Sequence, residues 1–421
     1  FWLKLEPKSL PSRSISHLQA MCARLFLLCA TIFCHSCNCS FLQNHTSELD
    51  TTAIFNAFIE EHNKQYERSS QEYARRHELF RMRLALIETH NSNHERLWDA
   101  GMNKFSDWSE EELKDLRGLQ AVASRRTGVK SLLQREESVA SLPQAVSWSN
   151  LTAIKNVKDQ GPCGSCWAMA ASTVLEAHAE IAGRPRSFSA QELVSCVSNP
   201  HNCGGSGSCR GATLELAMGY AIKHGVSTSE QTPYRAATGS CERKGSPRGF
   251  LWYHPTLPAE ELVPLTSTIG KHWASKNSKG SALGLKAWER LDENAYEPLM
   301  RAVAERGPVG VSVGASKWSS YQSGIFNGCS NNLVIDHAVT LIGYGVDSKS
   351  MKYWTVLNSW GPSWGEQGAI RVLRSDAEEE YCGTDDEPEM GTGCDGGPSS
   401  VKVCGTCGIL YDSVMPHFER L

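Results

Sequence analysis

One cysteine of this chain lies where a nucleophile is expected. Cys166 follows Gln160 and Cys163 in a turn marked by Pro162, and it begins a helical stretch that stops at Gly183. The dipole and the free N–H groups of a helix's first turn favour a thiolate over a thiol. A thiolate that attacks a carbonyl also needs an imidazole, which holds it as an ion pair and later protonates the leaving amine. The pattern therefore indicates acyl-transfer chemistry at Cys166.

The bulk composition narrows the class of protein. The chain has 421 residues, of which 40% are hydrophobic and 21% charged, values typical of a globular protein with two or three domains. The formal net charge of −4 provides no basic field, so nucleic-acid binding is not expected.

The cysteines are unevenly distributed. Five of the 16 lie in the first 40 residues, which leaves eleven (16 − 5) from Cys163 onward. An odd set of eleven suits ten paired sulfurs and one free thiol. So many cysteines in one region indicate an oxidising compartment. The alternative is a reduced intracellular protein with scattered thiols.

Residues 1–40 have the pattern of a leader. After Met21 and Arg24 come an apolar run over residues 25–33 and then small and polar residues, which is the order of a secretory signal peptide. The run is shorter than the ~20 residues that span a bilayer, so no membrane span is expected. Residues 1–20 are interpreted as an upstream extension without a function. The sequons at Asn44 and Asn150 predict a glycoprotein.

Three blocks follow the leader. Residues 51–117 are charged and helical in period, residues 118–141 are a linker, and residues 142–421 hold most of the tryptophan and glycine. In the last block helical patterns come first and short apolar runs bounded by Gly, Asn and Ser come later. The clearest of these runs are residues 309–313, 338–342 and 353–357. This order predicts an α+β fold.

Several separated motifs resemble those of papain-family cysteine proteases. Residues 163–167 match the family's signature around its nucleophile, C-G-[SA]-C-[WY]. Residues 142–148, 336–345 and 358–368 resemble, in order, the family's mature N-terminus, its histidine segment and its asparagine segment. The resemblance implies a papain-like fold of two lobes, the left lobe helical and the right lobe an antiparallel β structure, preceded by a helical inhibitory prodomain.

The resemblance also implies a role for each matching residue. Cys166 would attack the substrate carbonyl, and His337 would be its ion-pair partner and general acid–base. Asn358 would fix the His337 ring, and Trp360 would shield that bond from water. Gln160 would join the backbone N–H of Cys166 in an oxyanion hole, where a donor is typically worth ~10²–10³ in rate. The family uses no metal or cofactor for this chemistry, and none is expected.

One spacing departs from the family pattern. His337 lies 171 positions after Cys166 (337 − 166), beyond the roughly 130–150 that the family uses. The excess falls between Cys241 and Leu291, where prolines are frequent and periodic apolar residues are few. This stretch is expected to be a surface loop insertion.

The resemblance implies three disulfide bridges. They are Cys163–Cys209, Cys196–Cys241 and Cys329–Cys407. The remaining Cys203, Cys382, Cys394 and Cys404 can pair in three ways. Residues 385–397, which are acidic and Gly-rich, are expected to form an extra disulfide-tied loop; calcium binding there is the alternative to a solvated loop. A zinc or redox site at the two C-x-x-C pairs is disfavoured by the partner motifs around Cys166.

The helical block resembles the inhibitory propeptide of the cathepsin L-like branch. Its interrupted helix pattern is matched by Glu72, Arg76, Phe80, Ile87 and Asn91, and residues 101–107 match its second motif. Arg83 departs from the pattern, since that branch usually has Asn there. The implied role is to lie backwards through the active-site cleft until acid loosens its charged contacts. Cleavage is expected between Arg126 and Leu142.

The pocket for the second residue before the scissile bond is also implied by the resemblance. Its walls would include Leu214, Ser312 and Ile335, with Gly211 beside it and Asp412 as its floor. A carboxylate in an otherwise apolar pocket can pair with arginine or lysine, so the pocket is expected to accept apolar residues and arginine. The alternative is that Asp412 points to solvent.

The function predicted from the sequence is that of a cysteine endopeptidase made as a secreted zymogen. The alternatives are a catalytically silent binding or storage protein on the same scaffold and a zinc or redox protein. The expected partners are polypeptide substrates, the chain's own propeptide and cystatin-like inhibitors, and the enzyme is expected to be a monomer. The expected location is the secretory pathway, ending in a lysosome-like or vacuole-like acidic compartment or outside the cell.

Overall fold

The computed structural model describes residues 51–118, 142–241, 270–273, 278–375 and 381–421. Three predictions from the sequence lie outside the described residues. They concern the leader and the sequon at Asn44 (within residues 1–50), the expected cleavage site (within residues 119–141) and residues 242–269 of the insertion. The chain divides into two compact units, Phe1–Tyr66 and Glu67–Leu421. In the first unit residues 51–61 are helical, and the rings of Phe55 and Phe58 stack with their centroids 6.1 Å apart.

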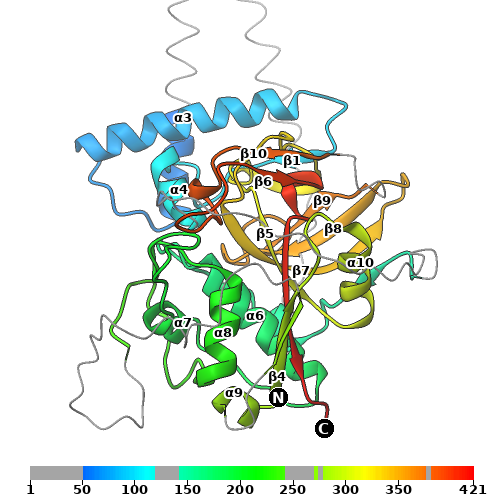
Figure 1. Cartoon of the computed structure of the whole chain (residues 1–421). Helices are drawn as coiled ribbons and strands as arrows, with labels where there is room; N and C mark the ends of the chain where they lie inside the picture. The colour runs from blue at the N-terminus through cyan, green and yellow to red at the C-terminus, as the bar shows by residue number, and fades with distance from the viewer. Residues whose placement is uncertain (1–50, 119–141, 242–269, 274–277, 376–380) are drawn as a thin grey trace, which may run out of the picture. The chain divides into compact units, whose positions relative to one another are not determined.

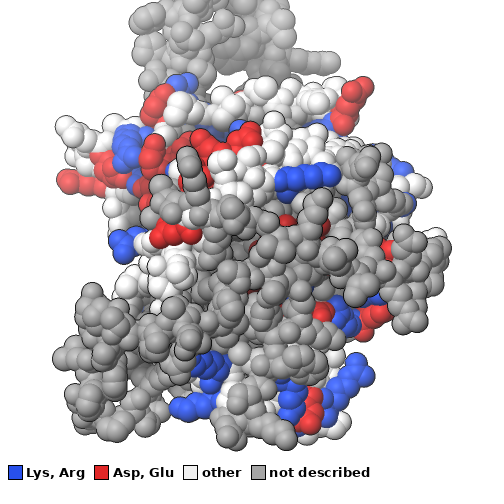
Figure 2. Space-filling view, viewed as in Figure 1, with Lys and Arg blue, Asp and Glu red and all other residues white. Residues whose placement is uncertain are grey.

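The second unit opens with the remaining part of the helical block. Its elements are α3 (Gln71–Asn91), β1 (Trp98–Ala100) and α4 (Glu110–Arg117). The Ser70 hydroxyl caps α3 by accepting a hydrogen bond from the Tyr73 N–H at 3.0 Å. Ser109 and Glu112 form a reciprocal capping box at the start of α4. Acidic and basic side chains lie side by side in the part of the surface where Figure 1 draws α3 and α4 (Figure 2). Within α3, Arg81 pairs with Glu78 at 2.6 Å.

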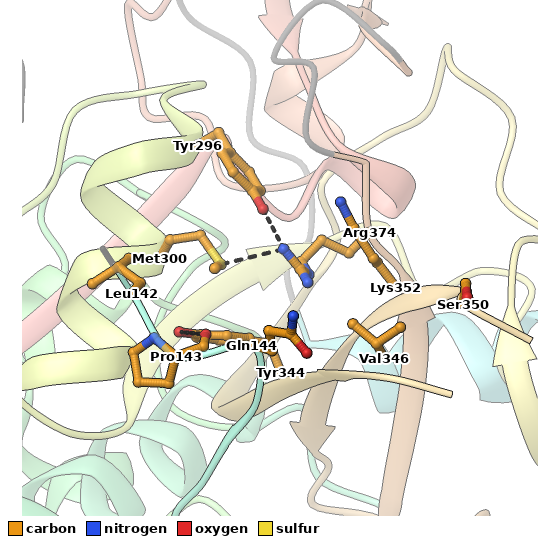
Figure 3. Close-up of a pocket in the computed structure, with 10 residues that line it drawn as sticks. All are labelled: Leu142, Pro143, Gln144, Tyr296, Met300, Tyr344, Val346, Ser350, Lys352 and Arg374. Carbon is orange, nitrogen blue, oxygen red and sulfur yellow. Dashed lines mark hydrogen bonds between the residues drawn. The ribbon is translucent and has the colours of Figure 1, made fainter. Parts of the chain in front are cut away.

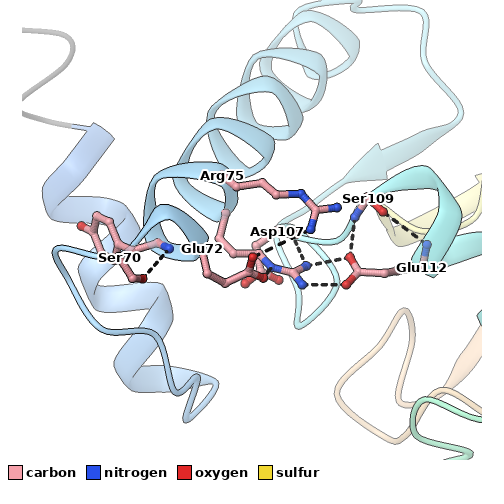
Figure 4. Close-up of polar contacts among 8 residues, drawn as sticks. Ser70, Glu72, Arg75, Asp107, Ser109 and Glu112 are labelled. Atoms are coloured by element: carbon pink, nitrogen blue, oxygen red, sulfur yellow. Dashed lines mark hydrogen bonds and ion pairs between the residues drawn. The ribbon is translucent and has the colours of Figure 1, made fainter.

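A buried arginine holds these two helices together. Arg76 donates to Glu72 at 2.6 Å, to both carboxylate oxygens of Glu112 at 2.6 Å and to the Asp107 carbonyl at 3.0 Å. Figure 4 shows how Glu72 of α3, Asp107 of the turn before α4, and Glu112 of α4 converge. Because a bidentate arginine–carboxylate pair fixes both partners in one geometry, this network sets the angle between the helices.

The helical block is attached to the rest of the unit through a strand pair. β1 pairs antiparallel with β6 (Tyr321–Phe326), Trp98 facing Gly324. Gly324 has φ +95, and a Cβ there would lie 2.5 Å from the Leu97 carbonyl oxygen, so this close approach requires glycine. The Arg83 guanidinium, at the position that departs from the family pattern, donates to the Ser319 hydroxyl at 3.3 Å.

One side of the peptidase region is helical (Figure 1). Its helices are α5 (Thr152–Lys155), α6 (Cys166–Ile181), α7 (Ala190–Cys196), α8 (Leu214–His224) and α9 (Lys279–Ala282). α6 is buried almost all round, as expected of a helix with small and apolar residues on every face. Its buried Glu176 is paired with Lys158 at 3.0 Å.

The other side is built on a sheet, the strands of which are drawn mostly in yellow and orange in Figure 1. In the described residues the strand order of this sheet is β1-β6-β9-β8-β7-β5-β12-β4-β3. A further strand, β2 (Val146–Ser147), pairs with β7. The helix α10 (Tyr296–Glu305) packs against β5 and β7. The remaining strands are β3 (Gly270–Trp273), β4 (Leu285–Arg290), β5 (Val309–Val313), β7 (His337–Val346), β8 (Lys352–Leu357), β9 (Ala369–Leu373) and β12 (Asp412–Phe418). All described pairings are antiparallel except that of β6 with β9. The predicted α+β order, helices before an antiparallel sheet, is confirmed.

The insertion is only partly the surface loop that the sequence predicted. Its later residues form β3, α9 and β4, and β4 pairs with β12 inside the sheet. Leu285, Ala287 and Trp288 of β4 are buried. The expectation of a loop was wrong for residues 285–290, because the apolar residues of this short strand are too few to produce a clear period before its partner strand is known.

Five disulfides join the described cysteines. They are Cys163–Cys209, Cys196–Cys241, Cys329–Cys407, Cys203–Cys394 and Cys382–Cys404. The first three are the bridges that the resemblance implies, and the last two decide among the three pairings left open. Between Cys382 and Cys404 lie β10 (Gly383–Asp385), the short helix η2 (Pro388–Met390) and β11 (Val401–Val403). A further short helix, η3 (Thr406–Gly408), follows.

Candidate active site

Cys166 is the first residue of α6 and the free cysteine of the described chain. His337 begins β7, and Asn358 directly follows the neighbouring strand β8. Because β7 and β8 are paired antiparallel, the start of one strand and the end of the other lie at the same edge of the sheet. The His337 Nε2 atom is 2.8 Å from Asn358 Oδ1, which leaves Nδ1 directed away from Asn358.

Gln160 is held beside this pair by backbone and side-chain bonds. Its N–H donates to the Ser359 carbonyl at 2.9 Å, and its Oε1 accepts from the Ser359 hydroxyl at 2.7 Å. The amide orientation is therefore fixed, with the Nε2 donor available for a carbonyl oxygen. The Trp360 ring lies over the imidazole of His337, their centroids 5.1 Å apart, and both residues are buried.

The end of α4 occupies these groups. The Leu116 carbonyl accepts from Gln160 Nε2 at 2.7 Å. The next carbonyl, that of Arg117, accepts from the Cys166 thiol at 2.8 Å and lies 3.2 Å from His337 Nδ1. The Arg117 oxygen thus contacts both Cys166 and His337.

Gly118 continues this path away from the thiol. A Cβ on Gly118 would lie 2.6 Å from the Gly164 carbonyl oxygen and 3.0 Å from Cys166 Sγ, so the chain passes with no room for a side chain. A Cβ on Gly211 would lie 1.8 Å from the Gly118 oxygen, which places that carbonyl against the backbone of Gly211. We call residues 116–118, which make these contacts, the propeptide track.

An ion pair fixes the track beside the imidazole. The Arg117 guanidinium lies 2.6 Å from Asp336, and the Asp336 carboxylate also accepts from the Ala315 N–H at 2.9 Å. Both side chains of the pair are about nine-tenths buried, with 11% of each exposed. A buried pair of this kind resists separation, because removing one partner leaves the other charge uncompensated.

Burial by the track changes the titration of the catalytic pair. Loss of water raises the pKa of the Cys166 thiol to about 12 and lowers the pKa of the His337 imidazole. In this state the Cys166 sulfur is held as a neutral thiol. The thiolate expected from the helix position alone is therefore absent, because desolvation outweighs the helix dipole at a fully covered sulfur.

The residues of the implied specificity pocket come together from three elements. Leu214 begins α8, Ser312 lies on β5, and Ile335 precedes β7; all three are buried. Asp412 begins β12 directly opposite Ser312 in the β5–β12 pairing, and it accepts a hydrogen bond from the Ser312 hydroxyl at 2.6 Å. Since Asp412 is 3% exposed, the alternative that it points to solvent is wrong.

The pocket floor is more polar than the sequence predicted. Arg290 of β4 donates to Asp412 at 2.9 Å, and it also lies 3.3 Å from Glu215 and 2.8 Å from Glu293. Burial, with the charge of Asp412 next, raises the pKa of Glu215 to about 7. The expectation of a lone carboxylate in an apolar pocket was wrong, because β4 and β12 pair across more than a hundred residues and bring Arg290 to Asp412. No local signal in the sequence could have indicated this contact.

A separate hollow of about 530 Å³ lies elsewhere, and none of its lining residues belongs to the catalytic set (Figure 3). Leu142, Tyr296 and Arg374 are among its lining residues, and the Arg374 guanidinium reaches toward Tyr296 and Met300.

In the described ranges no group of three or more His, Cys, Asp or Glu side chains could hold a metal ion. No described helix is long and apolar enough to cross a membrane.

Comparison with known families gives two matches. The family described as "Papain family cysteine protease" matches residues 142–392, and that described as "Cathepsin propeptide inhibitor domain (I29)" matches residues 55–113. The chain is 31% identical over 332 residues to the senescence-specific cysteine protease SAG39 of Oryza sativa subsp. japonica, a match that covers 77% of this chain and 86% of that protein. It is 32% identical over 311 residues to the Oryzain beta chain of the same plant, covering 72% of this chain but only 58% of that protein.

Solved structures of inactive precursors are also similar. The recombinant stem bromelain precursor has a TM-score of 0.63 and 27% identity, with 88% of this chain and 99% of that chain covered. The digestive procathepsin L 3 of Tenebrio molitor larval midgut has a TM-score of 0.62 and 25% identity, with 87% of this chain and 99% of that chain covered. Both likenesses extend over the propeptide as well as the peptidase region.

Proposed function

This chain belongs to the papain family of cysteine proteases and carries a cathepsin propeptide inhibitor domain, and on that basis we propose that it is the zymogen of an endopeptidase with Cys166 as nucleophile. The observation that carries this proposal is the occupation of the catalytic groups by the chain itself. Two successive carbonyls of the propeptide track lie at the donors of Gln160 and Cys166, which are the groups that would meet a substrate carbonyl.

The track is bound without being cleaved. The Arg117 carbonyl oxygen accepts a hydrogen bond from the Cys166 thiol at 2.8 Å. The sulfur is protonated, since burial raises the pKa of Cys166 to about 12. The thiolate nucleophile is therefore absent in this state.

Removal of the propeptide lets water reach the pair and allows the proton to pass from Cys166 to His337. The thiolate then attacks the scissile carbonyl carbon, and the negative oxygen that forms accepts hydrogen bonds from Gln160 Nε2 and the Cys166 N–H. His337 protonates the leaving amine as the acyl-enzyme forms. A water molecule, deprotonated by His337, hydrolyses the acyl-enzyme and restores the thiolate. Asn358 keeps the imidazole in the required orientation throughout, as its 2.8 Å contact with Nε2 indicates.

Labelling with an epoxysuccinyl inhibitor tests this function. We expect the activated protein to be labelled at Cys166, and the zymogen at pH 7 to react at least 10³-fold more slowly, because its thiol is covered and protonated. Mass spectrometry of peptides locates the label, and Cys166→Ala is the control that should remain unlabelled. Absence of label at Cys166 after activation would contradict the proposal and favour the silent binding or storage protein.

The pocket beside Gly211 is proposed to accept apolar residues and, more weakly, arginine at the second position before the scissile bond. Leu214 and Ile335 supply apolar walls, and the Asp412 carboxylate, which already binds Arg290, supplies a negative charge at the floor. A substrate guanidinium must therefore compete with Arg290 for Asp412. This competition is the physical reason to expect Phe to be preferred over Arg.

Paired fluorogenic peptides test this specificity. With Phe-Arg and Arg-Arg substrates, Asp412→Ala should lower the Arg-to-Phe ratio of kcat/KM. Arg290→Met should raise this ratio at least tenfold, since a freed charge-assisted hydrogen bond is worth about 1.5–3 kcal/mol. Arg301→Met is the matched control, because Arg301 pairs with Glu297 and Glu305 on the exposed side of α10. Unchanged Arg-Arg cleavage in Asp412→Ala would refute the role of Asp412.

The setting of this enzyme follows from the same features. In the part of the chain that the structure describes, five disulfides and one free thiol fit folding in the oxidising secretory pathway. Delivery to an acidic compartment, or secretion, and inhibition by cystatin-like proteins complete the proposal.

A further inference from the structure

The loop between Cys382 and Cys404 contains a segment that crosses from one wall of the active site to the other. We call residues 391–395 the strap. The Cys382–Cys404 bridge closes the base of the loop, and a second bridge joins Cys394 of the strap to Cys203, 191 positions earlier in the chain. The strap is thus tied to two separate regions of the fold.

One anchor of the strap is Ile335, a wall of the implied specificity pocket. The Thr392 N–H donates to the Ile335 carbonyl at 3.0 Å, and the Ile335 N–H donates to Asp385 of the same loop at 3.1 Å. A Cβ on Gly391 would lie 2.1 Å from the Ile335 oxygen, so the two backbones are in direct contact. The loop therefore uses both backbone polar groups of this wall residue.

The other anchor lies beside Gly211. The Gly204 N–H donates to the Gly393 carbonyl at 2.9 Å, and the Asp395 N–H donates to the His201 carbonyl at 2.8 Å. Asn202 adds a side-chain bond to Asp395 at 2.9 Å. Together with the Cys203–Cys394 bridge, these contacts fix the strap along the whole of residues 201–204.

The second anchor touches the propeptide track. A Cβ on Gly211 would lie 2.1 Å from the Gly204 oxygen and 1.8 Å from the Gly118 oxygen. The Gly204 N–H therefore binds the strap, while the Gly204 carbonyl lies beside Gly211. The Gly118 carbonyl lies beside Gly211 as well. The strap passes from Thr392 at Ile335 to Gly393 at Gly204 in a single residue step, a reach of about 4 Å. The strap thus joins Ile335 to Gly204, whose carbonyl shares the Gly211 backbone with the carbonyl of Gly118.

We propose that the strap is the outer wall of the subsite for the third residue before the scissile bond, and that it restricts this residue to a small side chain. The inference rests on the proposed function, because it concerns the same substrate path. A substrate that places its second residue between Leu214 and Ile335 must carry its next residue past Gly393. The bridges and the three backbone bonds to Ile335, Gly204 and His201 hold the strap in place, so a bulky side chain cannot displace it at low cost.

A series of N-acetylated fluorogenic peptides, X-Phe-Arg with X as Gly, Ala, Leu or Trp, tests the inference on the activated enzyme. We expect kcat/KM for Gly to exceed that for Trp at least tenfold. In the double variant Cys203→Ser/Cys394→Ser the ratio should fall to within threefold of unity, while kcat/KM for acetyl-Phe-Arg stays within twofold. The matched control is Cys196→Ser/Cys241→Ser, which removes a bridge of the helical side that does not touch the strap.

The outcomes separate this inference from the proposed function. Equal rates for Gly and Trp in the unaltered enzyme would overturn the strap proposal, as would discrimination that survives in the double variant. If the double variant does not fold, Asn202→Ala replaces it, because this substitution removes one strap contact without altering a disulfide. The Gly-to-Trp ratio of kcat/KM should then fall at least twofold. An unchanged ratio would count against the strap proposal. Failure to cleave acetyl-Phe-Arg at all would instead refute the endopeptidase.

Discussion

Replacing Cys166 with alanine is expected to lower kcat/KM for peptide hydrolysis by about 10⁶-fold, the scale on which a protease loses activity without its nucleophile. Cys166 is the free thiol of the described chain. The oxyanion donor at Gln160 would remain and would sustain only a small residual rate. Active-site-titrated wild-type enzyme and the activated variant, compared on Phe-Arg substrate, give this ratio directly.

Gln160→Ala is the graded control for that loss. It removes the Nε2 donor that now binds the Leu116 carbonyl, and it should cost about 10²–10³ in kcat. The thiol remains, so the variant should still be labelled by the epoxysuccinyl inhibitor. Residual activity of Cys166→Ala within a factor of 100 of wild type would mean that another group carries the reaction.

The second large effect is expected in the propeptide. Arg76→Ala removes the guanidinium that binds Glu72, Glu112 and the Asp107 carbonyl. It should lower the free energy of unfolding of the prodomain by about 3 kcal/mol. This is the lower end of the range for breaking a buried ion pair, because Glu112 is partly exposed. A change of that size corresponds to about 10²-fold in the opening equilibrium. The zymogen should therefore activate about 10²-fold faster.

The stability arm of this test uses the Cys166→Ala background, in which the zymogen cannot process itself. Thermal unfolding of the prodomain should shift down for Arg76→Ala, whereas Arg81→Ala, which removes an exposed pair with Glu78, should behave like the parent. Equal unfolding of the two variants would show that the buried network does not hold the inhibitory domain.

Acid acts on the same network with a definite sign. Burial alone would raise the pKa of Glu112, but hydrogen bonds from Arg76 and the Ser109 backbone lower it below its ordinary 4.5. Its contribution to stability is therefore fully present above pH ~4.5 and is lost as pH falls through the lower, folded-state pKa. Prodomain unfolding between pH 6 and pH 3 should steepen below pH ~4.5, and Glu112→Gln should remove part of that slope.

Local sequence determined the elements that carry the catalytic groups. The helix from Cys166 to Ile181 follows from its turn, its apolar content and the stop at Gly183. Strands over residues 309–313 and 353–357 follow from apolar runs between breakers. Such signals are local because backbone conformation depends mainly on neighbouring side chains and turn residues. The family motifs added the order of the catalytic residues along the chain.

What only the tertiary structure decided depends on contacts between distant segments. Arg290 reaches Asp412 because β4 and β12 pair, and Cys203 finds Cys394 because the loop after β9 returns to the helical side. The Cys166 thiol, expected as a thiolate at a helix start, is protonated because residues 116–118 exclude water from it. Pairing, charge compensation and desolvation are properties of what surrounds a group in space, which a one-dimensional pattern does not contain.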